Sequence, residues 1–196
     1  EIKPNSMQVQ ALKNLEETRK ENDRALLISA TGTGKTYLSA FDVKQAKAKK
    51  ILFVAHRKVI LERSKISYQR ILKNKKMEIF DSNFQINNKD EVVFAMVQTL
   101  NKEKNLNIFP KDYFDYIIID EVHHSGAKTY QSIFEYFKPK FLLGITATPE
   151  RTDDFNIYQL FNYNVAYEIR LQDAMKEELL CPFHYFGISD IVIDGE

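Results

Sequence analysis

The sequence predicts an α/β protein with a mainly parallel sheet that is covered by helices on both sides. Short apolar runs such as Val92–Val97 and Tyr116–Ile119 are rich in β-branched residues, which is typical of strands buried on both faces. These runs alternate with longer segments in which apolar residues recur at helical spacing. The length of 196 residues, with 44% hydrophobic and 28% charged residues, fits one ordinary domain with a short appendage.

The first part of the chain contains signals for three helices and two strands. Asn5 and Ser6 are good helix caps, and apolar residues follow them at helical spacing. In chain order we expect a helix that starts after Pro4, a strand over Arg24–Ser29, a helix over Lys35–Lys47, a strand over Ile51–Ala55 and a helix over His56–Leu72. In the last of these helices, the residues expected to face the core are Val59, Ile60, Ile66 and Ile71.

The second part continues the same alternation. The expected elements are strands over Val92–Val97, Tyr116–Ile119 and Phe141–Ile145, and a helix around Tyr130–Phe137. Two Asn- and Lys-rich connections, Asp81–Asp90 and Asn101–Lys111, are expected to be exposed loops. After Pro149 the pattern changes to shorter, aromatic elements. We therefore expect one domain over residues 1–150 and an extension or linker over 151–196. Because position 1 is not Met, we expect a piece of a longer protein.

Charge is segregated along the chain, although the formal net charge is only +1. Between Lys44 and Lys76 there are twelve basic residues and a single acid, Glu62. Such a block is a candidate contact for a polyanion, and a solvated helix face is an equally weighted alternative. The single cysteine, Cys181, excludes an internal disulfide and favours a reducing, cytoplasmic setting. No apolar run approaches the roughly 20 residues that span a bilayer, so we expect no membrane contact.

The strongest motif lies between a predicted strand and a predicted helix, at Ala30-Thr31-Gly32-Thr33-Gly34-Lys35-Thr36. Glycines let several backbone N–H groups converge on phosphate oxygens, and the helix N-terminus adds further donors. Lys35, expected on an exposed loop rim, would reach the β- and γ-phosphates, and the hydroxyl of Thr36 would bind Mg²⁺. Ser29 departs from the P-loop pattern, which has Gly there. The alternative is an ordinary Gly-rich turn, which the register of strand, turn and helix disfavours.

A second motif is the acidic pair Asp120-Glu121, which directly follows the apolar run 116–119. A strand that ends in two acids places carboxylates at the carboxyl edge of the sheet, where ligands of open α/β sheets bind. Asp120 could hold the magnesium shell through water, and Glu121 could accept a proton from an attacking water. Alone, such a pair is a weak motif and more often caps the next helix; together with the upstream loop it indicates nucleotide hydrolysis.

With these motifs in order, the chain resembles the first RecA-like domain of superfamily 2 helicases of the DEAD/DEAH type, close to the type III restriction enzyme branch. The residues that carry the resemblance, in addition to the two motifs above, are Gln8, Val54-Ala55-His56-Arg57, Val97-Gln98-Thr99-Leu100, His123 and Thr146-Ala147-Thr148-Pro149. The tail after Thr146 is similar to that of bacterial restriction and defence helicases. Met96 is a departure, since related proteins often have Thr at that position.

The resemblance implies a RecA-like P-loop NTPase fold, a three-layer sandwich, and roles for further residues. Gln8 would read the adenine edge of ATP, and His123 would link the nucleotide site to a second RecA-like domain. Thr146 and Thr148 would couple the nucleotide state to the grip on nucleic acid. Candidate nucleic-acid contacts are His56, Arg57, Gln98 and Thr99.

The function that we expect is ATP-driven translocation or unwinding on nucleic acid, DNA rather than RNA, with ATP and Mg²⁺ as cofactors. Two alternatives remain open at the level of sequence. One is a duplex translocase of a restriction or defence system that never separates strands. The other is a nucleotide-gated binding module with little turnover, against which the intact Asp120-Glu121 pair argues. Phosphate contacts carry no sequence information, so we expect no sequence specificity.

Overall fold

The computed structural model describes residues 2–30, 34–86, 89, 91–122, 126–147 and 157–169. Its centre is a seven-stranded sheet with the order β3-β4-β2-β5-β6-β1-β7. The strands are β1 Arg24–Ser29, β2 Lys50–Ala55, β3 Lys76–Ile79, β4 Glu91–Met96, β5 Tyr116–Asp120, β6 Phe141–Thr146 and β7 Val165–Ile169. Every pair of neighbouring strands is parallel, which confirms the predicted fold class.

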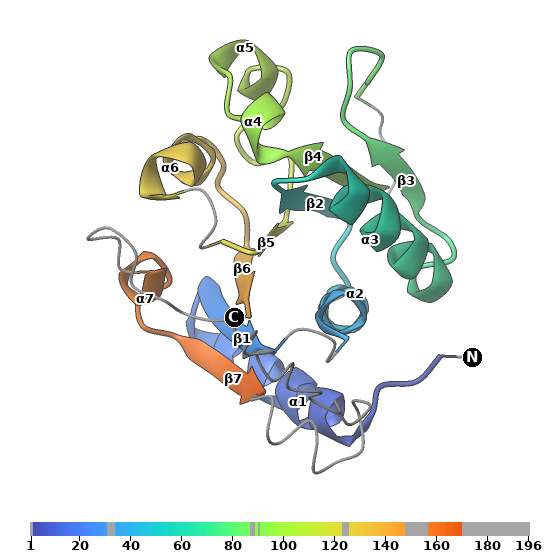
Figure 1. Ribbon diagram of the computed structural model, residues 1–196, viewed down its shortest axis with the longest axis vertical. Coiled ribbons are helices and arrows are strands. Elements are labelled where there is room, and N and C mark those ends of the chain that lie inside the picture. Colours follow the sequence, from blue (N-terminus) through green and yellow to red (C-terminus); the bar gives the residue numbers. More distant parts are fainter. Residues whose placement is uncertain are drawn as a thin grey trace, which may run out of the picture.

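Helices cover both faces of this sheet (Figure 1). Their bounds are α1 Ser6–Glu21, α2 Lys35–Gln45, α3 Lys58–Ile71, α4 Val97–Leu100, α5 Glu103–Leu106, α6 Gly126–Tyr136 and α7 Ile157–Leu160. Side chains of α1, α2 and α3 pack in one hydrophobic cluster with one face of the sheet. Those of α4 to α7 pack in a second cluster on the other face. Within the described ranges, no helix is long and apolar enough to span a membrane.

The central strands are almost entirely apolar because successive side chains point to opposite layers, and both layers are covered. In β1, Ala25 and Leu27 contact the layer of α1 to α3, whereas Leu26 and Ile28 contact the layer of α4 to α7. The same alternation holds along β2 and β4. The three-layer sandwich follows directly from these uninterrupted apolar runs.

Helix α3 turns a different face to the core than the sequence analysis expects. Its buried residues are Leu61, Ser64, Tyr68 and Ile71. Val59 and Ile66 are 55% and 50% exposed, so both were wrongly predicted to face the core. The ring of Tyr68 packs edge-on against Phe53 and Phe94 of the sheet, and this contact sets the rotation of the helix. Ile60 is partly buried against the same cluster, and Ile71 is buried as predicted.

The connection over 101–111 is not the exposed loop that its polar composition predicts. It contains α5, whose Leu106 is buried, and Phe109, whose ring is almost fully buried. Phe109 contacts five further aromatic rings, including Phe114 at a centroid distance of 5.0 Å and Phe137 at 6.2 Å. Two buried apolar residues among many polar ones give no clear periodicity, yet they anchor the segment.

Strands β3 and β7 are the two edges of the sheet, and the sequence analysis expects neither. Each has one partner strand, and their side chains are only partly buried, so neither has the fully apolar run of a central strand. β7 pairs with β1 with a shift of register after Leu26. The segment after residue 150 therefore contributes a strand to the same sheet, while the division of the chain at residue 150 stays a prediction.

A buried charged network joins α1, α2 and the sheet. Arg19 donates a hydrogen bond of 2.6 Å to Asp42 Oδ2, and the hydroxyl of Tyr116 donates to the same oxygen. The Asp42 side chain has no exposed surface. Burial raises the pKa of Asp42 above its usual range, against the opposing effects of the Arg19 charge and the two hydrogen bonds. Removing one partner would leave a buried polar group unsatisfied, so the network holds the two helices in register.

Gly144 in β6 lies directly against Phe161, the residue that follows α7. An added Cβ would lie 2.3 Å from Phe161 Cζ and under 3 Å from two further ring atoms. The Phe161 ring is fully buried, so it has no room to retreat. Only glycine leaves space for this ring against the sheet.

Gly144→Ala should lower the free energy of unfolding by about 1–3 kcal/mol, because overpacking forces the Phe161 ring or the strand to move. Urea unfolding of the variant and of its parent measures this change. Phe161→Leu in the same chain should recover part of the loss through a non-additive term. Strict additivity of the two substitutions in a double-mutant cycle would contradict the proposed clash.

Candidate functional site

The candidate residues gather where three neighbouring strands end. β6 lies between β5 and β1, and all three run in the same direction, so their carboxyl ends share one edge. Ser29 ends β1, Asp120 ends β5 and Thr146 ends β6. The parallel sheet thus brings together motifs that lie more than a hundred residues apart in the chain.

Gly34 joins the loop after β1 to α2, and its conformation requires glycine. Its φ of 76° lies in the left-handed region, which side chains disfavour. An added Cβ would also lie 2.8 Å from Gln8 Nε2. No side chain caps the first turn of α2, so its N–H groups remain suited to an anion. Thr31, Gly32 and Thr33, which the sequence analysis assigns to the phosphate cradle, lie outside the described residues.

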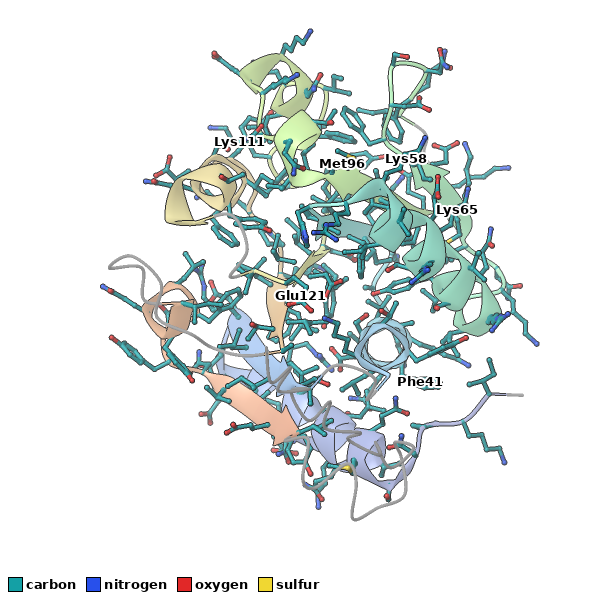
Figure 2. All side chains as sticks on the ribbon, in the orientation of Figure 1. Phe41, Lys58, Lys65, Met96, Lys111 and Glu121 are labelled. Carbon is teal, nitrogen blue, oxygen red and sulfur yellow. The ribbon has the colours of Figure 1, made fainter. Side chains whose placement is uncertain are left out.

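Lys35, the first residue of α2, reaches both acids at the end of β5. Its Nζ lies 3.5 Å from Asp120 Oδ1 and forms a second ion pair with Glu121 Oε1. The side chains of Lys35, Asp120 and Glu121 are only 17%, 4% and 12% exposed. The expectation of an exposed loop rim is therefore wrong for Lys35. Figure 2 shows Glu121 near the centre of the view, between β5 and α2.

Glu121 itself has an unusual backbone. Its φ of 53° lies in the left-handed region, which costs free energy for a residue with a side chain. The neighbouring residue Val122 is fully buried and donates its N–H to the carbonyl of Ile145 at 3.3 Å. This anchor on β6 follows immediately after Glu121, so the chain turns sharply there and the carboxylate is directed toward Lys35.

Gln8 in α1 is hydrogen-bonded to Gly34 at the start of α2. Its Nε2 donates to the carbonyl of Gly34 at 3.2 Å, and its Oε1 accepts from the N–H of Asn5 at 3.0 Å. Asn5 in turn accepts from the N–H of Gln8, which completes a capping box at the start of α1. The sequence analysis missed Asn5 as a partner, although the Asn-x-x-Gln spacing is the signal for this box. Whether Gln8 reads adenine stays a prediction.

The residues at this edge fit a hard cation that is held jointly with phosphates. Thr36 and Asp120 offer hydroxyl and carboxylate oxygens, the donors that Mg²⁺ prefers. Among the described residues, no group of three or more His, Cys, Asp or Glu side chains could form a cage for a metal. Mg²⁺ usually takes one or two carboxylates together with substrate phosphates, and the Thr36 hydroxyl and the Asp120 carboxylate are donors of that kind.

The candidate nucleic-acid residues lie at the carboxyl ends of β2 and β4. Gln98 in α4 donates from Nε2 to the carbonyl of His56 at 3.0 Å, so the ends of the two strands are joined. Arg57 is the exposed N-cap residue of α3. The carbonyl of Thr99 accepts a hydrogen bond from Asn105 Nδ2. The structure brings these four residues to the same edge as Lys35, and their role stays a prediction.

The basic segment Lys44–Lys76 is divided between two edges of the molecule. Arg57 and Lys58 follow β2 and lie at the carboxyl edge of the sheet. Seven of the lysines lie next to the starts of β2 and β3, at the opposite edge: Lys44, Lys47, Lys49, Lys50, Lys73, Lys75 and Lys76. Lys44 and Arg70 occupy the last turns of α2 and α3, where cations complement the helix dipole. The basic residues therefore do not all gather at the edge that carries Arg57, and whether the segment binds nucleic acid stays a prediction.

Of the three residues expected to couple the domains, the structure describes one. Thr146 is fully buried at the end of β6, beside Ile28 of β1. His123 and Thr148 lie outside the described residues.

Comparison with solved structures shows the fold. A nuclease-deletion mutant of the Type ISP restriction-modification enzyme LlaGI, solved in complex with a DNA substrate mimic, aligns with a TM-score of 0.74. The alignment covers 91% of this chain and 21% of that chain at 20% sequence identity. The prediction of a RecA-like α/β sandwich is thereby confirmed.

Comparison with curated proteins identifies relatives that are much longer. The Type I restriction enzyme EcoAI endonuclease subunit of Escherichia coli is 30% identical over 204 residues, which cover 97% of this chain and 25% of that protein. Protein L396 of Acanthamoeba polyphaga mimivirus, which carries the name of an ATP-dependent RNA helicase, is 32% identical over 82% of this chain and 30% of its own length. Residues 1–151 also match the family described as "Type III restriction enzyme, res subunit". The chain therefore belongs to that family.

Proposed function

We propose that this chain is the nucleotide-binding half of an ATP-driven motor that moves along DNA. The observation that carries the proposal is the ion cluster at the sheet edge, where Lys35 lies between Asp120 and Glu121 at the start of an uncapped helix. A cation and two carboxylates at a helix N-terminus match the chemistry of phosphoryl transfer. A purely structural ion cluster would not require the left-handed glycine or the open first turn beside it.

In this proposal the ion cluster rearranges when ATP binds. Lys35 leaves the carboxylates for the β- and γ-phosphates, which offer more negative charge. Asp120 and the hydroxyl of Thr36 would hold Mg²⁺, and Glu121, freed from Lys35, would orient a water and accept its proton. Magnesium, when bound, neutralises charge on the phosphates. Without nucleotide, the ion pair with Lys35 keeps Glu121 from acting as the base.

The nucleic-acid track in this proposal runs over the ends of β2 and β4. His56, Arg57, Gln98 and Thr99 lie there, close enough that Gln98 and His56 are hydrogen-bonded. The substrate DNA is supported by the EcoAI restriction subunit and by LlaGI, whose solved complex holds a DNA substrate mimic. The name of L396 supports RNA instead, which makes RNA the competitor to use in binding assays.

Two features of the complete protein belong to the same proposal. The catalytic site is completed by a second RecA-like domain that supplies an arginine finger, since the relatives are three to four times longer than this chain. Movement without strand separation is favoured by the similarity to a type I restriction subunit. A strand-displacement assay on the complete protein separates the duplex translocase from a helicase.

Lys35→Ala should abolish ATP affinity, because the ammonium contact to the phosphates is lost. It should also lower the free energy of unfolding of the nucleotide-free chain, because two nearly buried carboxylates lose their shared cation. Adding Glu121→Gln should restore part of the stability and none of the affinity. Calorimetry with ATP and urea unfolding measure the two effects. Equal ATP affinity in mutant and parent would refute the assignment.

Arg57→Ala should weaken DNA binding and reduce its salt dependence. In a plot of log binding constant against log salt concentration, each neutralised phosphate contributes a slope of roughly −0.9 on duplex DNA and about −0.7 on a single strand. Loss of one phosphate contact should therefore make the slope shallower by about that amount. The matched control is Lys49→Ala, an exposed lysine at the opposite edge of the sheet. Titrations over a range of salt concentrations measure both. An unchanged slope for Arg57→Ala, or an equal loss in the control, would contradict this track.

The isolated chain should bind ATP and Mg²⁺ but hydrolyse ATP at barely detectable rates, with little stimulation by DNA. The missing arginine finger is worth on the order of 10³ to 10⁵ in rate. Joining the chain to its second RecA-like domain should restore turnover, and Glu121→Gln in that longer protein should remove it again. Steady-state phosphate release is the measurement. Brisk DNA-stimulated hydrolysis by residues 1–196 alone would overturn the need for a second domain.

A further inference from the structure

A chain of buried hydrogen bonds runs from the nucleotide site into the next helix. The hydroxyl of Ser39 in α2 lies 2.8 Å from the carbonyl oxygen of Thr36 and 2.8 Å from the hydroxyl of Tyr68 in α3. Ser39 and Tyr68 are both fully buried. Thr36 is the residue proposed above to bind Mg²⁺ through its side chain. This series of hydrogen bonds therefore begins at the backbone of a proposed metal ligand.

The direction of these hydrogen bonds follows from the groups available. A carbonyl oxygen only accepts, so the single proton of the Ser39 hydroxyl goes to Thr36. The Tyr68 hydroxyl must then donate to Ser39 Oγ. Burial, strengthened by the charges of Asp120 and Asp42, raises the pKa of Tyr68 well above its ordinary value. Tyr68 therefore keeps its proton at neutral pH, and the donor is always present.

The ring of Tyr68 continues the connection into the sheet. It packs edge-on against Phe53 of β2 and Phe94 of β4, at centroid distances of 5.5 Å in both cases. Phe53 and Phe94 are direct cross-strand partners and also contact each other. The strands that carry these rings end at Ala55 and Met96, and just after these ends the side chain of Gln98 is hydrogen-bonded to the carbonyl of His56.

We propose that Tyr68 is a positioning residue that links the first turn of α2 to the two strand ends of the nucleic-acid track. The proposal rests on the function proposed above and adds the route by which its two sites communicate. One end of the Tyr68 side chain is bonded to α2, and the ring is enclosed by the two strands. A shift of Thr36 on nucleotide binding therefore moves α3 relative to β2 and β4.

The sequence offered only a partial signal for this residue. Tyr68 follows Leu61 at seven residues, the spacing of one helix face, and both are buried. A tyrosine on a buried face needs a partner for its hydroxyl. That the partner is Ser39, a small polar residue in a different helix, is visible only in the tertiary structure.

The test is the coupling between nucleotide and DNA in the protein that contains both RecA-like domains. The affinity for a short labelled DNA duplex is measured with ADP and with a non-hydrolysable ATP analogue, at fixed salt and with Mg²⁺. The ratio of the two affinities is the coupling factor, typically about 5- to 150-fold between linked sites. Tyr68→Phe keeps the ring and removes only the hydroxyl, and should bring this factor close to one.

Tyr116→Phe is the matched control. Tyr116 is also buried on the same face of the sheet, and its hydroxyl also bonds to α2, but to Asp42 rather than to the turn that holds Thr36. Both variants should unfold at lower urea concentration than the parent, while Tyr116→Phe should keep the parent coupling factor. Equal loss of coupling in the two variants would mean a structural role only and would overturn the proposal.

Ser39→Ala removes the other partner of the Ser39–Tyr68 hydrogen bond and should reproduce the effect of Tyr68→Phe. The double variant should lose no more coupling than either single variant. A parent protein that couples nucleotide to DNA, with an unchanged factor in Tyr68→Phe and Ser39→Ala, would overturn this inference alone. A parent that binds neither ATP nor DNA would overturn the proposed function together with it.

Discussion

The parallel alignment of all strands is the constraint on which the rest of this structure depends. It buries both faces of the sheet, so each layer needs its own set of helices. It also collects the carboxyl ends of β1, β5 and β6 at one edge, where Ser29, Asp120 and Thr146 lie. A different strand order would separate these residues without changing any local structure. The chemistry of the edge is thus a product of topology.

Helix α2 is the element through which this edge is joined to the rest of the domain. Its first residue, Lys35, holds the acidic pair of β5. One turn later Ser39 bonds to Tyr68, and Asp42 bonds to Arg19 and Tyr116. These contacts are nearly all buried, where polar groups are costly unless paired. These contacts hold α2 against α1, α3 and the sheet.

The strongest sequence signals predicted their elements correctly because each signal lies within the element itself and does not depend on which neighbour the element packs against. Central strands such as β2 and β5 are apolar on both faces, and α1 is announced by the cap at Asn5. The strands that sequence analysis missed, β3 and β7, are half-buried edges that become strands by pairing. The prediction of which face of α3 is buried was wrong for the same reason. Val59 and Ile66 are apolar, but it is Tyr68 that packs against the aromatic side chains of the sheet.

By itself the sequence determined the fold class, the glycine at the start of α2 and the acidic pair at the end of β5, because these depend on backbone conformation and on local apolar pattern. Only the tertiary structure decided that Lys35 lies between Asp120 and Glu121, that Gln8 bonds to Gly34, and that Tyr68 bonds to Ser39. Each of these contacts joins elements far apart in the chain. Hydrogen bonds and ion pairs act over a few ångströms, so no local pattern specifies which distant groups the packed sheet will bring within that range.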